Sequence, residues 1–160
     1  MPLARKPVSS RQAKERLQDL CVRGEQCTYQ LRTKLKQWQI PADEADKIMQ
    51  SLEDERYVDD ARYARSFVHD KVRFAGWGRR KLHMMLAAKR IPSDIIAEAL
   101  AEIDPNLYSA VLIKVLQSKT RPHPELLQDY EGRTRLYRFA LQRGFESDAI
   151  AAALKALTNT

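Results

Sequence analysis

The chain has 160 residues, 44% of them hydrophobic, a composition that favours a packed globular protein over a disordered one. Its 28 Lys and Arg residues exceed its 21 Asp and Glu residues, and the resulting net charge of +7 favours a polyanionic partner or an anionic membrane surface. No apolar run is long enough to span a membrane, and the two cysteines are too few for a zinc site or a disulfide framework.

The N-terminal segment, residues 1–8, is expected to be flexible. It carries basic residues with no apolar stretch behind them, so we expect no signal peptide. Cys21 and Cys27 are expected to be reduced thiols, which is typical of a cytoplasmic protein. A redox role for either thiol is left open.

The pattern of apolar residues predicts an all-α protein. Only five glycines occur, and no segment alternates apolar and polar residues as a half-buried strand does. The segment LRTKLKQWQIPADEADKIMQSL, from Leu31, aligns with LHMMLAAKRIPSDIIAEALAEI, from Leu82, and with LYRFALQRGFESDAIAAALKAL, from Leu136. This alignment predicts three tandem repeats. Their ranges are 9–56, 57–104 and 105–158.

Each repeat is predicted to begin with one amphipathic helix. Ser9 and Gln12 have the spacing of a capping box before the first of these helices. In the second repeat, Tyr63, Phe67 and Lys71 recur every four residues, as on one face of a helix. The three helices are expected at about residues 10–23, 60–74 and 106–119.

A helix-turn-helix unit is predicted to complete each repeat. Its turn is anchored by Ile40, Ile91 or Phe145. Ser93 and Ser147 are expected to cap the following helix, whose positive N-terminal dipole favours the Asp that comes next. A single repeat buries too little surface to be very stable, so we expect the repeats to stack into an elongated, curved array.

The adjacent carboxylates Asp59 and Asp60 are the first candidates for a catalytic or metal site. They stand at a predicted helix N-terminus, where a carboxylate accepts backbone N–H groups, so capping is the favoured role. The histidines, His69, His83 and His123, lack metal-ligand spacing, and the sequence has neither a phosphate-binding loop nor a GxSxG motif. We therefore expect no catalytic residue, no metal, no cofactor and no enzymatic activity.

The charge is segregated along the chain. Residues 41–70 include 4 basic and 9 acidic residues, whereas residues 71–90 include 7 basic residues and no acidic one. In the second helix of each repeat, basic residues avoid the apolar stripe, and this threefold recurrence favours a polyanion-binding surface over a merely solvated face. These residues are Arg32 and Lys36, then Arg80, Lys81 and Arg90, then Arg135 and Arg138. Such a surface contacts phosphates without reading sequence.

Trp77 lies between Gly76 and Gly78, just before the predicted second helix of repeat two. An aromatic side chain in this position either stacks on a base or anchors the core, and the anchor is the favoured interpretation. Tyr63 and Phe67 fall on an apolar helical spacing and are expected in the core.

The second repeat resembles the RecX family of regulatory proteins. The segments that carry the resemblance are YVDDARYARSFV (57–68), GWGRRKLHMML (76–86) and KRIPSDII (89–96). The motif residues, expected to be mainly structural, are Tyr57, Asp59, Asp60, Arg62, Tyr63, Phe67, Gly76 and Gly78. Members of this family are built from tandem three-helix repeats. They bind the RecA recombinase filament on single-stranded DNA and inhibit its ATPase, strand-exchange and coprotease activities.

The resemblance implies a monomeric, cytoplasmic regulator in DNA repair, recombination and the SOS response. Its implied partners are the RecA filament and single-stranded DNA, with no membrane. The implied contact residues are Arg32, Lys36, Lys71, Arg73, Arg79, Arg80, Lys81 and Arg90. The chain departs from the family pattern at Arg79, where proline is common, at Met85, where an acid is common, and at Arg90, where glycine usually supplies a left-handed helix end.

Two other functions fit the same sequence. The main alternative is a free-standing DNA-binding protein, because the last two helices of each repeat resemble a helix-turn-helix. A sequence-specific reader needs Arg, Asn or Gln at the start of its recognition helix, whereas these helices start PADEADK, PSDIIAE and ESDAIAA, which disfavours duplex readout. The third possibility is a scaffold whose charge serves only solubility.

Overall fold

The structure is a computed structural model that describes residues 7–159, and every regular element in that range is a helix. The α-helices are α1 (Ser10–Arg23), α2 (Thr28–Gln37), α3 (Ala42–Asp54), α4 (Asp60–Asp70), α5 (Arg79–Ala88), α6 (Ser93–Ala101), α7 (Pro105–Thr120), α8 (Tyr130–Gln142) and α9 (Ser147–Thr158). A π-helix, η1 (Lys71–Ala75), continues α4, and a 3₁₀ helix, η2 (Pro124–Leu127), joins α7 to α8. Most of the N-terminal segment predicted to be flexible lies outside the described residues.

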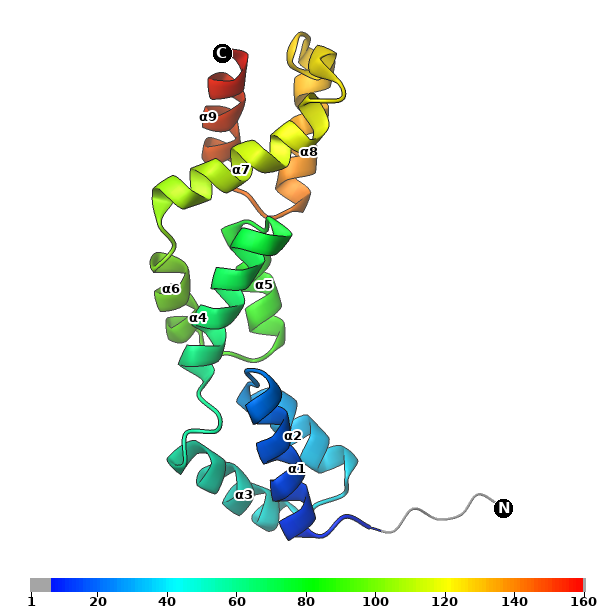
Figure 1. Cartoon of the computed structure of the whole chain (residues 1–160), viewed down its shortest axis with the longest axis vertical. Coiled ribbons are helices and arrows are strands. Elements are labelled where there is room, and N and C mark those ends of the chain that lie inside the picture. The colour runs from blue at the N-terminus through cyan, green and yellow to red at the C-terminus, as the bar shows by residue number, and fades with distance from the viewer. Residues whose placement is uncertain (1–6, 160) are drawn as a thin grey trace, which may run out of the picture.

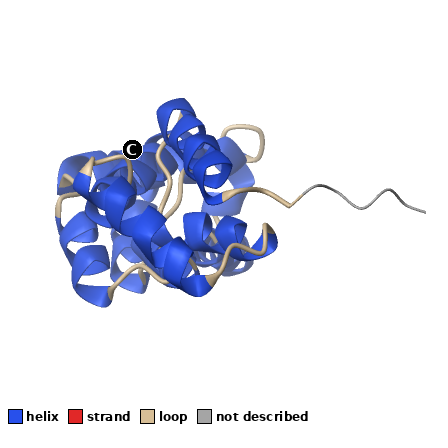
Figure 2. Cartoon of the chain, turned by 90° about the horizontal axis from the view of Figure 1, so that it is seen from below, coloured by secondary structure: helices blue, strands red, loops and turns tan. Residues whose placement is uncertain are grey.

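The helices form three consecutive groups along one axis: α1–α3, α4–α6 and α7–α9 (Figure 1). The stack is elongated and curved, and the view along its axis shows helices joined by loops (Figure 2). The predicted all-α array of three three-helix repeats is therefore confirmed. The predicted repeat boundaries, after residues 56 and 104, fall between helices and stay predictions.

The leucines that the repeat alignment makes equivalent are all buried. Leu31, Leu82 and Leu136 are 0%, 0% and 1% exposed. Each lies on the second helix of its repeat, Leu31 in one buried cluster and Leu82 and Leu136 together in another. The repeat alignment therefore places equivalent core positions in the correct register.

The turn between the second and third helix of each repeat passes through one left-handed residue. Gln39, Arg90 and Gly144 occupy this position, with φ of 57°, 56° and 97°. The next residue donates its backbone N–H to a carbonyl five positions earlier, at 3.0, 3.2 and 3.2 Å in chain order, which closes the helix end. The turn is therefore kept at Arg90 without a glycine, although a side chain in this conformation costs about 1 kcal/mol or more.

The caps predicted for the third helices are wrong. Ser93 and Ser147 are the first helical residues of α6 and α9, and the cap positions fall on Pro92 and Glu146, which make no side-chain cap. The reason is that the closed turn brings the chain into the helix one residue earlier than predicted. The Ser147 hydroxyl instead pairs with the Tyr137 hydroxyl at 2.6 Å. The capping box predicted at the start of α1 is confirmed.

The buried apolar residues form two separate clusters. One cluster belongs to α1–α3 and the loop residues Ile40 and Val58. The other extends through α4–α9 and also takes in Cys27, the cap residue of α2, whose side chain is fully buried. Repeats two and three therefore share one core, whereas repeat one has a core of its own.

Candidate nucleic-acid and protein interface

The acid-free segment predicted to bind a polyanion folds into η1, a glycine-flanked turn and α5. Gly76, with φ of 65°, ends η1 in the left-handed region, and Gly78 precedes α5. Arg73 and Arg80 are exposed on this segment, while Lys71 and Lys81 are half-buried. The local fold thus brings cations from a helix end and from the next helix start to one place.

The indole ring of Trp77 holds two of these cations. The Nζ atoms of Lys71 and Lys81 lie 4.9 and 4.3 Å from its ring centroid, within the range of a cation–π contact. Trp77 is itself half-buried against the core, and the ring of Phe67 meets it edge-on at 6.1 Å. Trp77 is therefore a core anchor, as predicted, and it also orders two positive charges on the surface.

The Arg79 side chain makes contacts with other residues of the same chain. Its Nη1 lies 3.3 Å from Glu146 Oε2, and its guanidinium lies 4.0 Å from the ring centroid of Tyr108. The Tyr108 hydroxyl accepts the Arg79 backbone N–H at 2.9 Å and donates to Glu146 Oε1 at 2.8 Å. Burial, and then the Glu146 carboxylate, raises the pKa of Tyr108. These contacts compete with the binding role predicted for Arg79.

The remaining predicted contact residues differ in whether they contact another side chain of the protein. Arg32 is paired with Asp46 at 2.8 Å, and the Arg90 guanidinium lies 5.1 Å from the ring centroid of Tyr29. Lys36 is exposed. Over residues 7–159, neither Lys36, Arg73 nor Arg80 forms an ion pair, and all three residues are exposed.

The paired carboxylates of the motif have structural contacts. Asp59 Oδ1 accepts the Arg62 backbone N–H at 3.0 Å, which confirms the predicted cap of α4. Asp60 Oδ1 accepts the Thr28 backbone N–H at 2.8 Å, so it joins repeat two to the start of α2. Arg62 Nε reaches Glu25 at 2.6 Å. Among the described residues, no His, Cys, Asp or Glu cluster has a metal-binding arrangement.

The other motif residues shape the packing around α4 and α5. Tyr63 is buried and stacks on half-buried Phe67 with ring centroids 5.9 Å apart, whereas Tyr57 packs on the core of repeat one. Gly78 touches the backbone of the α8–α9 turn, because its N–H donates to the Arg143 carbonyl at 2.8 Å. A Cβ atom on Gly78 would lie 2.4 Å from backbone atoms of that turn. Glycine at this position therefore permits repeats two and three to meet.

Phe74 is an exposed aromatic residue that the sequence did not single out. Its exposed fraction is 82%, although the predicted single α-helix over 60–74 places it about three turns after Tyr63 and on the same face. The predicted range matches α4 and η1, which together are helical from Asp60 to Ala75, but the last turn is a wider π turn that the sequence did not predict. Phe74 is thus exposed next to the exposed Arg73 in the chain, and an aromatic ring near a cation is typical of base stacking.

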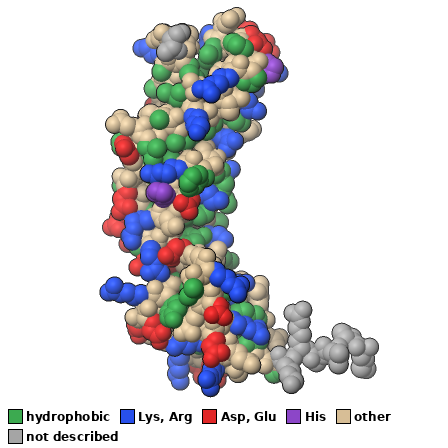
Figure 3. Space-filling model, in the orientation of Figure 1, with side chains coloured by type: hydrophobic (Ala, Val, Ile, Leu, Met, Phe, Trp, Pro, Cys, Tyr) green, Lys and Arg blue, Asp and Glu red, His purple; other side chains and the backbone are tan. Residues whose placement is uncertain are grey.

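Lys and Arg side chains occur over all three groups of helices on the face drawn in Figure 3, with Asp and Glu side chains among them. A single cationic stripe that joins the repeats stays a prediction. None of the helices within residues 7–159 combines the length and the apolar character that a membrane span requires.

Two family models match the chain. They are RecX, second three-helix domain, over residues 59–100 and RecX, third three-helix domain, over residues 108–154. The regulatory protein RecX of Prosthecochloris aestuarii is 33% identical over 132 residues, which cover 81% of this chain and 83% of that protein. RecX of Clostridium botulinum is 30% identical over 81% of this chain and 61% of its own length. For RecX of Lacticaseibacillus paracasei, at 28% identity, these shares are 72% and 48%, so the chain spans only part of some relatives.

Solved structures have the same arrangement of helices. RecX from Lactobacillus salivarius has a TM-score of 0.85 at 18% identity, covering 94% of this chain and 97% of that one. A second regulatory protein RecX has a TM-score of 0.78 at 19% identity, covering 91% and 71%. At these identities the solved structures show only that the fold is shared. The matching domains and the relative at 33% identity show membership of the same family. The chain therefore belongs to the RecX family of regulatory proteins.

Proposed function

We propose that this protein is a non-enzymatic regulator that binds the RecA filament on single-stranded DNA and inhibits the ATPase, recombinase and coprotease activities of RecA. The observation that carries the proposal is the acid-free segment 71–90, folded by η1 and α5 into a surface with exposed Arg73, Arg80 and Phe74. Family membership supports RecA as the partner. We further propose that the protein acts as a monomer in the cytoplasm.

The elongated array supports binding to several RecA protomers at once. Exposed cations lie on different repeats, for example Lys36 on α2 and Arg80 on α5. Once one repeat is bound, contacts by the next repeat are effectively intramolecular, which raises the apparent affinity without new contacts. Phosphate contacts of the exposed arginines would be electrostatic and weakened by salt. Inhibition is therefore expected at fewer molecules than DNA-binding sites.

RecA-dependent ATP hydrolysis on single-stranded DNA, measured with and without this protein, tests the proposal. We expect inhibition by the natural chain, and the double variant Arg73→Glu with Arg80→Glu should need an about tenfold higher concentration for the same effect. The matched control is Arg23→Glu with Lys114→Glu, which changes the same charge at exposed positions outside the segment. No inhibition by the natural chain would reject RecA as the target.

The free-standing DNA-binding protein is distinguished in the same experiment. Binding of each variant to bare single-stranded DNA is measured by fluorescence anisotropy at several salt concentrations. If inhibition falls only in proportion to bare-DNA binding, the protein acts by competing for the strand. If inhibition falls further than bare-DNA binding, contacts with RecA itself contribute.

A further inference from the structure

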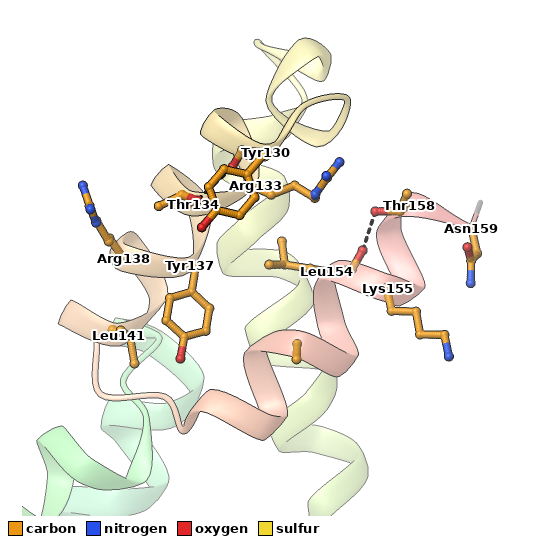
Figure 4. Close-up of a pocket in the computed structure, with 11 residues that line it drawn as sticks. Tyr130, Arg133, Thr134, Tyr137, Arg138, Leu141, Leu154, Lys155, Thr158 and Asn159 are labelled. Atoms are coloured by element: carbon orange, nitrogen blue, oxygen red, sulfur yellow. Dashed lines mark hydrogen bonds between the residues drawn. The ribbon is translucent and has the colours of Figure 1, made fainter.

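A groove of about 750 Å³ lies between α8 and α9, outside the acid-free segment that carries the proposed function (Figure 4). Tyr137 and Leu154 face each other across it from the two helices, and Leu141 continues the apolar wall of α8; all three are half-buried. Helix α7 packs against both α8 and α9. The 3₁₀ helix η2 also packs against both, while the apolar groove between α8 and α9 stays open to solvent.

Three cations lie at the edges of this apolar floor. Arg133 extends from α8 toward the end of α9, while Arg138 and Lys155 lie at the outer edges of the two helices (Figure 4). The described residues that line the groove include no acid, and none of these three cations has an ion-pair partner within residues 7–159. The exposed ring of Tyr130, 80% accessible, stands at one end. The groove therefore offers an apolar surface and unneutralised positive charge together.

In the two preceding repeats, the residue equivalent to Arg133 is bound by a carboxylate of the following repeat. The alignment of Leu82 with Leu136 makes Arg79 equivalent to Arg133, and Arg79 is paired with the Glu146 carboxylate of the following repeat at 3.3 Å. The equivalent residue of repeat one, Thr28, also receives a carboxylate from the following repeat, since its backbone N–H donates to Asp60 at 2.8 Å. Arg133 has no such carboxylate and donates to the Leu127 carbonyl at 3.1 Å.

We propose that the α8–α9 groove binds an acidic amphipathic helix of a partner protein. The residues on α8 that line it recur at helical spacing from Tyr130 to Leu141, a length of about 17 Å, or three turns of a docked helix. Apolar side chains of the partner fill the floor at Leu154, and its carboxylates pair with the surrounding cations. Single-stranded nucleic acid fits less well, because its bases stack on aromatic rings, whereas Leu141, Ala151 and Leu154 give the floor an aliphatic surface that suits the apolar side chains of a helix. This inference stands whether or not RecA is the target.

The probe is a fluorescein-labelled designed peptide of about 18 residues, with Leu on one helical face and Glu beside it. Fluorescence anisotropy with the full chain should show saturable binding with a Kd of about 10 μM. The variant Arg138→Glu with Lys155→Glu should weaken binding about tenfold or more. The matched control is Arg23→Glu with Lys114→Glu, which changes the same charge at exposed positions off the groove and should alter the Kd by less than about twofold.

A second peptide of identical composition, scrambled so that its leucines no longer share a face, separates groove binding from charge attraction. Four results would overturn the proposal. They are no saturable binding up to about 1 mM, equal binding of the scrambled peptide, an equal loss in the control variant, and displacement of the peptide by oligodeoxythymidine that itself binds through Arg138 and Lys155. The last result would assign the groove to nucleic acid. Circular dichroism and thermal unfolding confirm that each variant keeps the natural fold.

Discussion

At the residue scale, a few buried polar contacts hold the neighbouring repeats together. Exposed pairs such as Arg11–Glu15 contribute little, because water and salt screen them. Tyr108 is only 3% exposed, and its hydroxyl joins the start of α5 to the start of α9 through Arg79 and Glu146. Losing one such buried partner leaves the other polar groups unsatisfied, which costs more than the bond itself contributes.

Tyr108→Phe is expected to lower the free energy of unfolding by about 1–3 kcal/mol, because it removes both hydrogen bonds and keeps the ring. Urea unfolding measures this change. The control is Tyr137→Phe, whose hydroxyl pairs only with Ser147 in a more exposed place and should cost about 1 kcal/mol or less. An equal effect of the two substitutions would show that Tyr108 has no special role at this junction.

The same residue predicts a dependence on alkaline pH. The pKa of Tyr108 is raised in the folded state, so its contribution is fully present below the ordinary tyrosine pKa of about 10 and is lost as pH rises beyond that value. The difference in stability between the natural chain and Tyr108→Phe should therefore shrink above about pH 10. A constant difference through that range would contradict the raised pKa.

At the element scale, the sequence predicts helices well and their junctions poorly. Apolar residues at helical spacing and the cap at Asp59 are local signals, so the helices and the start of α4 follow from the sequence. The π turn of η1 has no such signal, and the pairing of Arg79 with Glu146 joins residues 67 positions apart. The exposure of Phe74 and the engagement of Arg79 therefore emerge only from the structure.

The α8–α9 turn is the element that joins repeat three to repeat two. Gly144 has φ of 97°, its carbonyl accepts the Arg80 backbone N–H at 2.9 Å, and a Cβ atom on it would lie 2.4 Å from Lys81 N. Gly144→Ala is expected to lower the free energy of unfolding by about 2 kcal/mol or more, from strain and from the clash with α5.

The matched substitution is Gly24→Ala at the end of α1. Gly24 has an extended backbone, with φ of −179°, and an added Cβ would meet nothing within 4 Å. This variant should differ from the natural chain by about 0.5 kcal/mol or less in urea unfolding. Comparable losses of unfolding free energy in the Gly24 and Gly144 variants would mean that close contact between the repeats does not cause the destabilisation at the α8–α9 turn.

At the scale of the whole molecule, the three repeats are not equivalent units. The repeat pattern in the sequence predicts three similar modules, yet the buried residues divide into one core for α1–α3 and one shared core for α4–α9. The contacts between these two bodies include the Asp60 bond to Thr28, the Arg62 pair with Glu25 and the side chain of Cys27. The sequence pattern predicts the length of the repeat, but it does not predict which neighbouring repeats share a core.

This division predicts that repeat one unfolds before or separately from the remainder of the protein. Leu35 and Leu136 are each 1% exposed, one in each core, so truncation to alanine should cost about 2–5 kcal/mol at either position. Leu35→Ala should lower the protection of amide protons in α1–α3 and leave that in α4–α9 nearly unchanged. Leu136→Ala should lower protection throughout α4–α9, because repeats two and three share their core. Hydrogen exchange followed by mass spectrometry on the full chain measures both patterns. If Leu35→Ala destabilises all nine α-helices of the described chain equally, the array is one cooperative unit and the two cores do not act independently.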